Sequence, residues 1–275
     1  MAFRPPKVSI MASNPSIAST AVIFAGGLGT RMREETEFRP KPMVRVGGRP
    51  ILWHIMKTYS SFGVSNFVIL AGYKGEMIKD YFLNYAALQN DFTIRLGTSS
   101  EIEFHGEHDE LDWTVTVLDT GTETLTGARL LQAKKFLTDG SFFCTYGDGV
   151  ADIDLGRLSE SHHSSQAVAT VSVASPPSRF GLLEFGAENE VIGFREKPVV
   201  DDWVNIGFFL FEPGVFHYLN EISSLESDPL VALANEGQLN AYKHSGFWQP
   251  MDTIRDRDYL EELWNAGAAP WKVWD

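Results

Sequence analysis

The sequence has a single cysteine, a shortage of basic residues and no long hydrophobic run. Because Cys144 is the only cysteine, the chain cannot form an intrachain disulfide framework, and this favours a reducing, cytoplasmic location. Its apolar neighbours predict an unreactive core thiol. No apolar run reaches the length of a membrane span, so we expect no membrane partner. The 23 Lys and Arg against 36 Asp and Glu give a net charge of −13, which argues against a nucleic-acid partner.

A continuous apolar segment is also missing from residues 1–19, which contain Pro, Ser and scattered basic residues. We interpret this segment as a disordered leader and not as a signal peptide. Met11 is an alternative start, and the absence of acidic residues is also compatible with a short organellar presequence. Residues 20–275 contain enough apolar side chains for one large α/β domain.

The most informative stretch begins with a short apolar run, residues 21–25, which predicts a buried strand. It is followed by Gly26-Gly27-Leu28-Gly29-Thr30-Arg31. Glycines directly after a strand let backbone N–H groups approach an oxyanion, because no Cβ is in the way. Arg31 and Lys41 add positive charge where a phosphate would lie. The segment therefore indicates a polyphosphate-binding loop.

Three alternatives to this interpretation exist. A dinucleotide-binding loop would have the pattern G-x-G-x-x-G, but Met32 occupies the position of the third glycine. A P-loop would require Lys-Ser or Lys-Thr after the glycines, and neither follows. The glycines alone are equally compatible with a tight strand-to-helix turn flanked by solvated cations.

The full run, AGGLGTR at residues 25–31 followed about ten residues later by Lys41-Pro42, resembles the signature of the sugar-phosphate nucleotidyltransferases. This resemblance implies an α/β fold: a Rossmann-like, mixed but mostly parallel sheet flanked by helices, with a small sugar-binding β extension. It also implies that the backbone around the loop holds the nucleotide. The implied nucleotide-binding residues here are Phe24, Ala25, Gly26, Gly27, Leu28, Gly29 and Thr30, together with Gly147.

The hydrophobic pattern predicts alternating strands and helices up to residue 150, and mainly short strands after it. We expect further strands at 67–71, 114–118, 142–146, 167–174, 181–185, 191–196 and 204–211. We expect helices at 51–62, 74–88, 124–137, 229–236 and 254–266. Residues 20–150 would form the nucleotide-binding half and residues 151–275 the sugar-phosphate-binding half, with the later strands covering the substrate cleft.

Two aspartates are candidate metal ligands. Asp148 lies between glycines directly after a predicted strand, and Asp252 precedes a predicted helix. Asp148 could belong to an ordinary turn and Asp252 could cap the helix. Mg²⁺ takes one or two carboxylates together with substrate phosphates. The family has Asp at both matching positions, so the resemblance implies Mg²⁺ as the cofactor.

The segment Glu196-Lys197-Pro198 resembles the family element in which Lys binds the sugar phosphate and Glu binds a sugar hydroxyl. Gly181 and Asn205 match segments that line the family's sugar pocket. Trp248 could offer a flat apolar face to the sugar or could belong to the core. Without the resemblance, Glu196 and Lys197 could equally be a solvated surface pair.

Several segments narrow the resemblance to the cytidylyl branch of the family, which uses CTP and glucose 1-phosphate; they are residues 41–43, 48–57, 72–75, 126–130, 146–150, 246–253 and 269–274. The chain departs from that branch at Leu125, where Met is usual, and at Ala128, where Gly is usual. Cytosine presents two adjacent acceptors, O2 and N3, to which an Arg fork could donate. Arg129 is the candidate, with Thr124 and Gly127 as the wall, although Arg129 could also be a surface cation.

The implied reaction converts CTP and glucose 1-phosphate into CDP-glucose and pyrophosphate by in-line attack, with Arg31 and Lys41 as the catalytic cations. The resemblance also implies a homo-oligomer. Alternatives are another nucleotide or sugar phosphate, a non-catalytic regulatory relative, and a nicotinamide-dependent oxidoreductase. The incomplete glycine fingerprint weighs against the oxidoreductase. The presence of Arg31, Lys41, Asp148 and Asp252 weighs against a non-catalytic relative.

Overall fold

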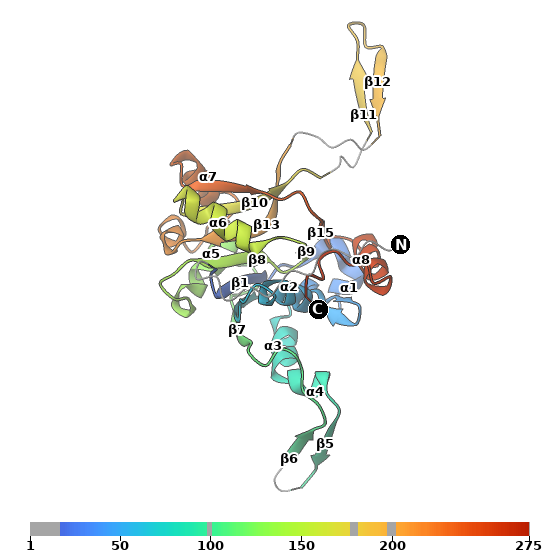
Figure 1. Ribbon diagram of the computed structural model, residues 1–275, viewed down its shortest axis with the longest axis vertical. Coiled ribbons are helices and arrows are strands. Elements are labelled where there is room, and N and C mark those ends of the chain that lie inside the picture. Colours follow the sequence, from blue (N-terminus) through green and yellow to red (C-terminus); the bar gives the residue numbers. More distant parts are fainter. Residues whose placement is uncertain (1–16, 98–100, 177–180, 197–201, 275) are drawn as a thin grey trace.

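A seven-stranded sheet forms the centre of the molecule (Figure 1). The computed structural model describes residues 17–97, 101–176, 181–196 and 202–274. The strand order is β14 (Leu239–Lys243), β10 (Ala169–Ala174), β13 (Val204–Phe211), β8 (Phe142–Tyr146), β1 (Thr20–Ala25), β4 (Asn66–Ala71) and β7 (Thr114–Asp119). β13 runs antiparallel to both of its neighbours, and the remaining pairs are parallel. The predicted mixed, mostly parallel sheet is confirmed.

Helices cover both faces of this sheet, which explains why its central strands are continuously apolar. Ala21, Ile23 and Ala25 of β1 face one hydrophobic cluster, and Val22 and Phe24 face the other. The helices are α1 (Arg33–Thr36), α2 (Ile51–Ser60), α3 (Gly75–Leu83), α4 (Tyr85–Gln89), α5 (Thr126–Ala133), α6 (Leu155–Ser165), α7 (Asp228–Asn235) and α8 (Ile254–Asn265), with short 3-10 turns at Thr30–Met32, Lys41–Met43, Lys134–Phe136 and Pro213–Tyr218.

Most expected elements are present, but several details differ. The helix expected at 74–88 is divided into α3 and α4 at Asn84, whose φ of −103° is not helical. The helix α6 was not expected, because its sequence LGRLSESHHSS is largely polar; the Asp154 side chain caps it by accepting from the Arg157 N–H. The strands β10 and β13 belong to the central sheet, so of the strands expected after residue 150 only those within residues 182–195 form a separate β extension.

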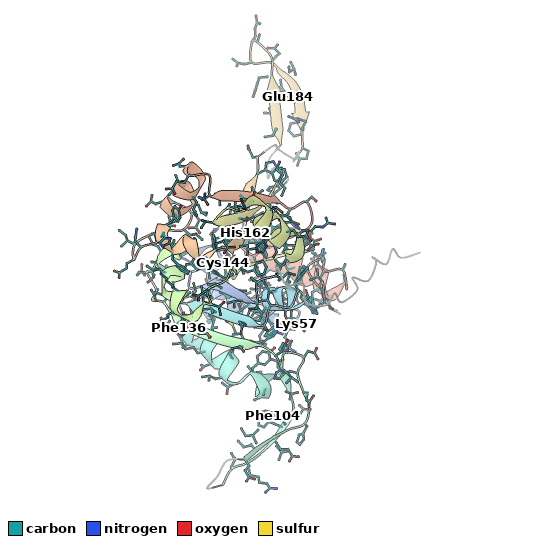
Figure 2. The ribbon with its side chains drawn as sticks, turned by 60° about the vertical axis from the view of Figure 1, so that its left-hand side comes forward. Lys57, Phe104, Phe136, Cys144, His162 and Glu184 are labelled. Carbon is teal, nitrogen blue, oxygen red and sulfur yellow. The ribbon has the colours of Figure 1, made fainter. Side chains whose placement is uncertain are left out.

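Four two-stranded ladders accompany the main sheet. Two are short: β2 (Arg45–Val46) with β3 (Arg49–Pro50), and β9 (Gly149–Ala151) with β15 (Trp248–Pro250). The other two are hairpins, β5 (Phe92–Arg95) with β6 (Glu101–Phe104) and β11 (Leu182–Phe185) with β12 (Val191–Arg195). Figures 1 and 2 show these hairpins extending from opposite ends of the body, one carrying Phe104 and the other Glu184.

The cysteine lies inside the body, as expected (Figure 2). Cys144 is fully buried, and burial raises the pKa of its thiol well above the usual value, so it stays an uncharged core residue. Within the described part of the chain, no helix is both long and apolar enough to cross a membrane. The expected leader falls mostly on residues 1–16, outside the described residues. Ala18 is buried, and the Ser19 carbonyl accepts a hydrogen bond from the Asn66 N–H at 3.1 Å.

Candidate active site

The candidate site lies where the strand order of the sheet reverses. β1 and β8 are parallel neighbours with Phe24 opposite Tyr146, while the chain continues from β1 to β4 on the other side. Ligands of open α/β sheets bind at the carboxyl ends of the strands beside such a reversal. The loop 26–29 follows β1 and Asp148 follows β8, so both lie at this edge.

A short ladder brings the second aspartate to the same place. Pro250 of β15 is paired with Gly149 of β9, and the Met251 N–H donates to the Asp148 carbonyl at 2.8 Å. Asp252 is the next residue, so the register of this ladder determines that it lies near Asp148. The two carboxylates are over one hundred positions apart in sequence, and sequence analysis did not predict the ladder that joins them.

Lys41 lies between the two aspartates. Its Nζ donates to Asp148 Oδ2 at 2.7 Å and to Asp252 Oδ1 at 2.7 Å, and its side chain is only 9% exposed. A guanidinium nitrogen of Arg31 is 2.6 Å from Asp252 Oδ2. The structure thus brings together both candidate catalytic cations and both candidate metal ligands.

Asp252 is not a helix cap. The cap of α8 is Thr253, whose hydroxyl accepts from the Asp256 N–H at 3.2 Å, and the Asp256 carboxylate accepts from the Thr253 N–H at 2.8 Å. This reciprocal capping box satisfies the start of the helix. The Asp252 carboxylate is therefore directed to Lys41 and Arg31 instead.

The two carboxylates could together hold a divalent metal ion. They converge on one positive charge, the Lys41 ammonium, so the place between them suits a cation. Among the described residues, no group of three or more His, Cys, Asp or Glu could hold a metal. A site with only two protein carboxylates suits Mg²⁺, which takes its other ligands from phosphates and water.

Arg31, Asp148 and Asp252 line a cleft of about 380 Å³, whereas the largely buried Lys41 is not one of its lining residues. Of the predicted sugar-binding residues, Asn205 and Trp248 line it, whereas Gly181 and Glu196 lie at the base of the β11–β12 hairpin and do not. Lys197 lies outside the described residues. The lining residues are Arg31, Thr145, Tyr146, Asp148, Gly149, Asn205, Ile206, Phe208, Trp248, Pro250 and Asp252.

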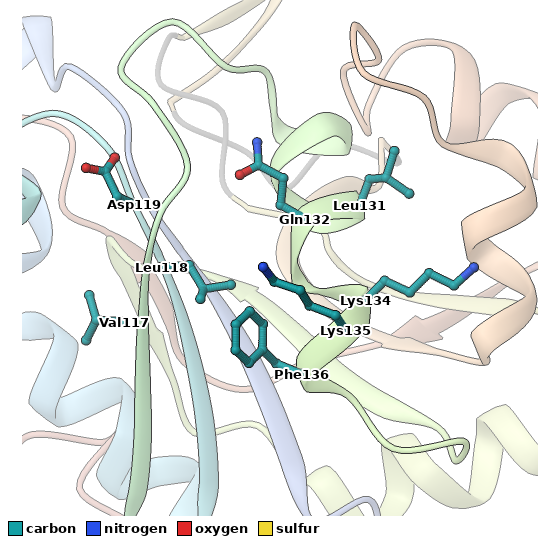
Figure 3. Close-up of a pocket in the computed structure, with 8 residues that line it drawn as sticks. All are labelled: Val117, Leu118, Asp119, Leu131, Gln132, Lys134, Lys135 and Phe136. Atoms are coloured by element: carbon teal, nitrogen blue, oxygen red, sulfur yellow. The ribbon is translucent and has the colours of Figure 1, made fainter.

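A second, larger hollow of about 710 Å³ lies elsewhere, between the edge strand β7 and the end of α5 (Figure 3). It contains none of the predicted site residues. Its lining residues are Val117, Leu118, Asp119, Leu131, Gln132, Lys134, Lys135 and Phe136. The convergence of charged groups, and not the size of the hollow, therefore identifies the candidate site.

The glycine loop has a backbone conformation that favours glycine. Gly29 has a φ of +62°, and a Cβ there would lie 2.6 Å from Cγ2 of Thr36. The Thr36 hydroxyl donates to the Gly29 carbonyl at 3.0 Å and holds the turn in place. The side chains of Phe24 and Ala25 are buried in the core, so these two residues could contact a nucleotide only through their backbone. Leu28 is exposed, as are Gly27 and Thr30.

Arg129 is buried behind this loop. One terminal nitrogen donates to the Thr120 hydroxyl at 2.5 Å and the Ala71 carbonyl at 3.3 Å. The other donates to the carbonyls of Gly26 at 3.2 Å and Thr122 at 3.0 Å. Arg129 thus joins three loops at the strand ends, and both terminal nitrogens already have acceptors within the chain. It is not the surface cation that sequence alone left open.

The other residues of the predicted base wall lie near the start of α5. Gly127 is buried against Ser223, with no room for a side chain, and Thr124 is half-buried beside Gly121. The Gly147 N–H donates to the Phe24 carbonyl at 2.9 Å and joins the ends of β8 and β1. Sequence analysis did not identify Tyr146 as a lining residue, although its place at the end of a predicted strand before Asp148 was a usable signal.

The chain is similar to known proteins along most of its length. The chain is 47% identical over 258 residues to the glucose-1-phosphate cytidylyltransferase of Salmonella typhimurium, covering 93% of this chain and 99% of the relative. It is 28% identical over 249 residues to the mannose-1-phosphate guanyltransferase of Aspergillus oryzae, covering 87% of this chain and 62% of that relative.

Solved structures show the same fold. HddC from Yersinia pseudotuberculosis matches with a TM-score of 0.66 at 21% identity, covering 90% of this chain and all of that one. UTP-bound UGPase from Acinetobacter baumannii matches with a TM-score of 0.64 at 18% identity, covering 90% and 94%. The sequence profile of the nucleotidyl transferase family matches residues 20–254. The protein belongs to the nucleotidyl transferase family.

Proposed function

We propose that the protein transfers a cytidylyl group from CTP to α-D-glucose 1-phosphate, giving CDP-glucose and pyrophosphate. The observation that carries this proposal is the cluster of Lys41, Asp148 and Asp252 at the strand ends beside the glycine loop. The choice of CTP and glucose 1-phosphate rests on the identity of 47% with a glucose-1-phosphate cytidylyltransferase over nearly its whole length.

In the proposed reaction, a phosphate oxygen of the sugar attacks the α-phosphorus of CTP in line with the departing pyrophosphate. This oxygen is already ionised at neutral pH, so the step needs neither a general base nor a covalent intermediate. Catalysis then depends on alignment and on neutralising charge. The backbone of residues 24–30 would hold the phosphates, and Arg31 and Lys41 would offset charge on the bridging and leaving oxygens.

Asp148 and Asp252 would hold Mg²⁺, which would supply positive charge to offset that of the phosphates. Asn205 and Trp248, which line the cleft, would contact the sugar. Lys197 would bind the sugar phosphate, Glu196 a sugar hydroxyl, and Gly181 would belong to the sugar pocket. Gly181 and Glu196 lie directly before and after the β11–β12 hairpin. In this arrangement residues 20–150 contribute mainly to nucleotide binding and residues 151–275 mainly to sugar-phosphate binding.

Cytosine selection would occur at the start of α5, with Thr124 and Gly127 as the wall. Arg129 would donate to the base by exchanging one of its four present acceptors for cytosine. The structure gives Arg129 a second task, since it holds the Gly26 carbonyl. Arg129→Ala should therefore lower activity with every nucleotide and also reduce the preference for CTP over UTP. An unchanged preference would exclude Arg129 as the residue that distinguishes the bases.

The decisive assay is pyrophosphate release with glucose 1-phosphate and each of the four nucleoside triphosphates in turn. We expect turnover with CTP and much slower turnover with UTP, ATP and GTP. Fast turnover with another nucleotide would keep the reaction class and overturn the CTP assignment. Binding of CTP and CDP-glucose without any pyrophosphate release would indicate a non-catalytic relative and refute the proposal.

We further propose that the protein is a cytoplasmic homo-oligomer in which the two hairpins pack against other copies of the chain. An isolated two-stranded hairpin is marginally stable in water. Both hairpins nevertheless expose apolar side chains, with Ile102 51% and Phe194 62% exposed. Phe92, Phe104 and Ile192 are exposed as well. Such surfaces usually mark a protein interface.

Light scattering after size exclusion tests this assembly. We expect a mass that is a multiple of the 30.7 kDa chain, and a smaller mass for Phe104→Glu or Phe194→Glu. A wild-type monomer at micromolar concentration would refute the homo-oligomer while leaving the enzymatic proposal intact.

A further inference from the structure

A carboxylate outside the cleft joins the end of β8, which borders the cleft, to the start of α5. Glu226 lies in the loop before α7 and accepts hydrogen bonds from three hydroxyl groups. The donors are Tyr146 at the end of β8, Thr126 at the start of α5, 2.7 Å from Glu226 Oε2, and Ser224, 2.8 Å from the same oxygen. Two of these donors belong to elements that the proposed function uses: β8 leads to Asp148, and α5 carries the predicted base wall.

The loop that carries Glu226 is attached to α5 by other contacts as well. The Leu225 N–H donates to the Thr126 hydroxyl at 2.9 Å, and the Ala128 N–H donates to the Ser223 carbonyl at 3.1 Å. The Leu225 side chain is fully buried. Loss of the Glu226 carboxylate should therefore leave the loop docked on α5. What the carboxylate adds is the bond to Tyr146.

Tyr146 lines the cleft two residues before Asp148. Its ring contacts Phe24 and Phe209, with centroid separations of 5.7 Å and 5.9 Å. Gly207 has a φ of +81°, and a side chain there would overlap the Tyr146 ring. Packing thus determines the position of the ring, whereas the Glu226 carboxylate accepts the hydrogen bond from its hydroxyl.

The Glu226 carboxylate is ionised at neutral pH. Burial by itself would raise the pKa of Glu226, but hydrogen bonds from Tyr146, Thr126 and Ser224 outweigh burial and hold that pKa below its usual value. The Tyr146 hydroxyl therefore donates to a charged acceptor, which makes this a charge-assisted hydrogen bond.

We propose that Glu226 is a positioning residue that joins the start of α5 to the strand end carrying Asp148, acting through Tyr146. This inference rests on the proposed function, because it assigns α5 to the nucleoside and Asp148 to the metal and phosphates. With Glu226 in place, the two ends of a bound CTP are held at a set separation. Without it, each end keeps its own contacts but their alignment is lost, so kcat should fall more than the affinity for CTP.

The test is a double-mutant cycle with Glu226→Ala, Tyr146→Phe and the combined variant. We expect each single variant to lower kcat by about 10- to 100-fold, the range corresponding to a charge-assisted hydrogen bond, with KM for CTP changed by less than about threefold. The combined variant should be no slower than the slower single variant, because both remove the same bond.

The chain offers a matched control, Glu236→Ala. Glu236 accepts a hydrogen bond from the Tyr218 hydroxyl at 2.7 Å, but the pair is exposed and neither residue lines the cleft. We expect its kcat to stay within about twofold of wild type, since exposed polar pairs contribute little. If Glu226→Ala does not fold, Glu226→Gln replaces it; the neutral amide should give an intermediate loss of kcat that is again non-additive with Tyr146→Phe.

Two results would overturn the inference: a kcat within threefold of wild type for Glu226→Ala, or losses that multiply in the combined variant. If wild-type protein released no pyrophosphate from CTP, the proposed function would fail instead. In that case the free energy of unfolding would be measured for the same three variants, to test whether Tyr146 and Glu226 are coupled. Additive effects there would show that the two side chains are not coupled and would also overturn the inference.

Discussion

Replacing Lys41 by methionine removes the charge that both aspartates share while keeping a long apolar stem. The Lys41 ammonium is 2.7 Å from each of Asp148 and Asp252, so its loss leaves two carboxylates facing each other. Arg31 contacts Asp252 at 2.6 Å and keeps its charge beside this pair. We therefore expect Lys41→Met to reduce both the stability of the fold and the rate of turnover.

The structure sets the size of each loss. Lys41 is buried but Asp148 is about one-third exposed, so the cost in unfolding free energy should be about 2 kcal/mol, between the values for surface pairs and for broken buried pairs. Turnover should fall about 10²–10³-fold, by analogy with the loss of an oxyanion-hole donor. That fall corresponds to about 3–4 kcal/mol of barrier.

The assays are pyrophosphate release at saturating CTP and urea unfolding of the same preparations. Lys57→Met is the control, because Lys57 has a largely buried stem and pairs with Glu110 at 3.5 Å away from the cleft. Because this pair is also largely buried, Lys57→Met should reduce stability by about as much as Lys41→Met, roughly 2 kcal/mol, and leave turnover within about twofold. A Lys41→Met enzyme within threefold of wild type would remove Lys41 from the mechanism. An equal loss of turnover in Lys41→Met and Lys57→Met would show that turnover follows the stability of the fold and not the charge at Lys41.

Three further outcomes are expected. Gly29→Ala should lower the free energy of unfolding by about 1–2 kcal/mol in urea titrations, because the φ of Gly29 is positive and the new Cβ would meet Thr36. Gly27→Ala is the control and should leave the free energy of unfolding unchanged, because no atom lies within 4 Å of its Cβ. Burial lowers the pKa of His54 to about 4 from 6.5, so the stability that its neutral form contributes is complete above pH 6.5 and is lost as the pH falls toward 4. Urea unfolding at pH 5 should therefore show about 2 kcal/mol less stability than at pH 7.5. Equal stability at the two pH values would contradict this expectation. Asp252→Asn should raise the Mg²⁺ concentration for half-maximal rate by about tenfold or more, and an unchanged requirement would exclude Asp252 as a ligand.

The fold was largely predictable because its central strands are buried on both faces. Residues 21–25 and 142–146 are short apolar runs bounded by polar or glycine residues, and the structure has strands there. Prediction failed where packing outweighs local pattern. Helix α6 is polar along most of its length, and β14 is an edge strand without a strong apolar signal. The place of β10 and β13 in the main sheet depends on pairings that no local pattern specifies.

The candidate site was predictable in its residue types but not in its assembly. Lys41, Asp148 and Asp252 follow from the sequence and its resemblance, yet their meeting depends on the β9–β15 ladder, whose strands are three residues long. Arg129 was chosen for its fork of donors, and only the structure shows that neighbouring carbonyls use that fork. Glu226 gave no signal at all, because its three partners come together only in the folded chain.

The central claim is that one bound CTP and its metal lie against Lys41, Asp148 and Asp252 together. A crystal structure of the protein with CTP and Mg²⁺ tests this claim most directly. The account predicts a metal ion bound to both aspartates and to a phosphate of CTP, with the Lys41 ammonium within hydrogen-bonding distance of the triphosphate. A triphosphate beyond the reach of Lys41, or a metal held by other residues, would contradict it.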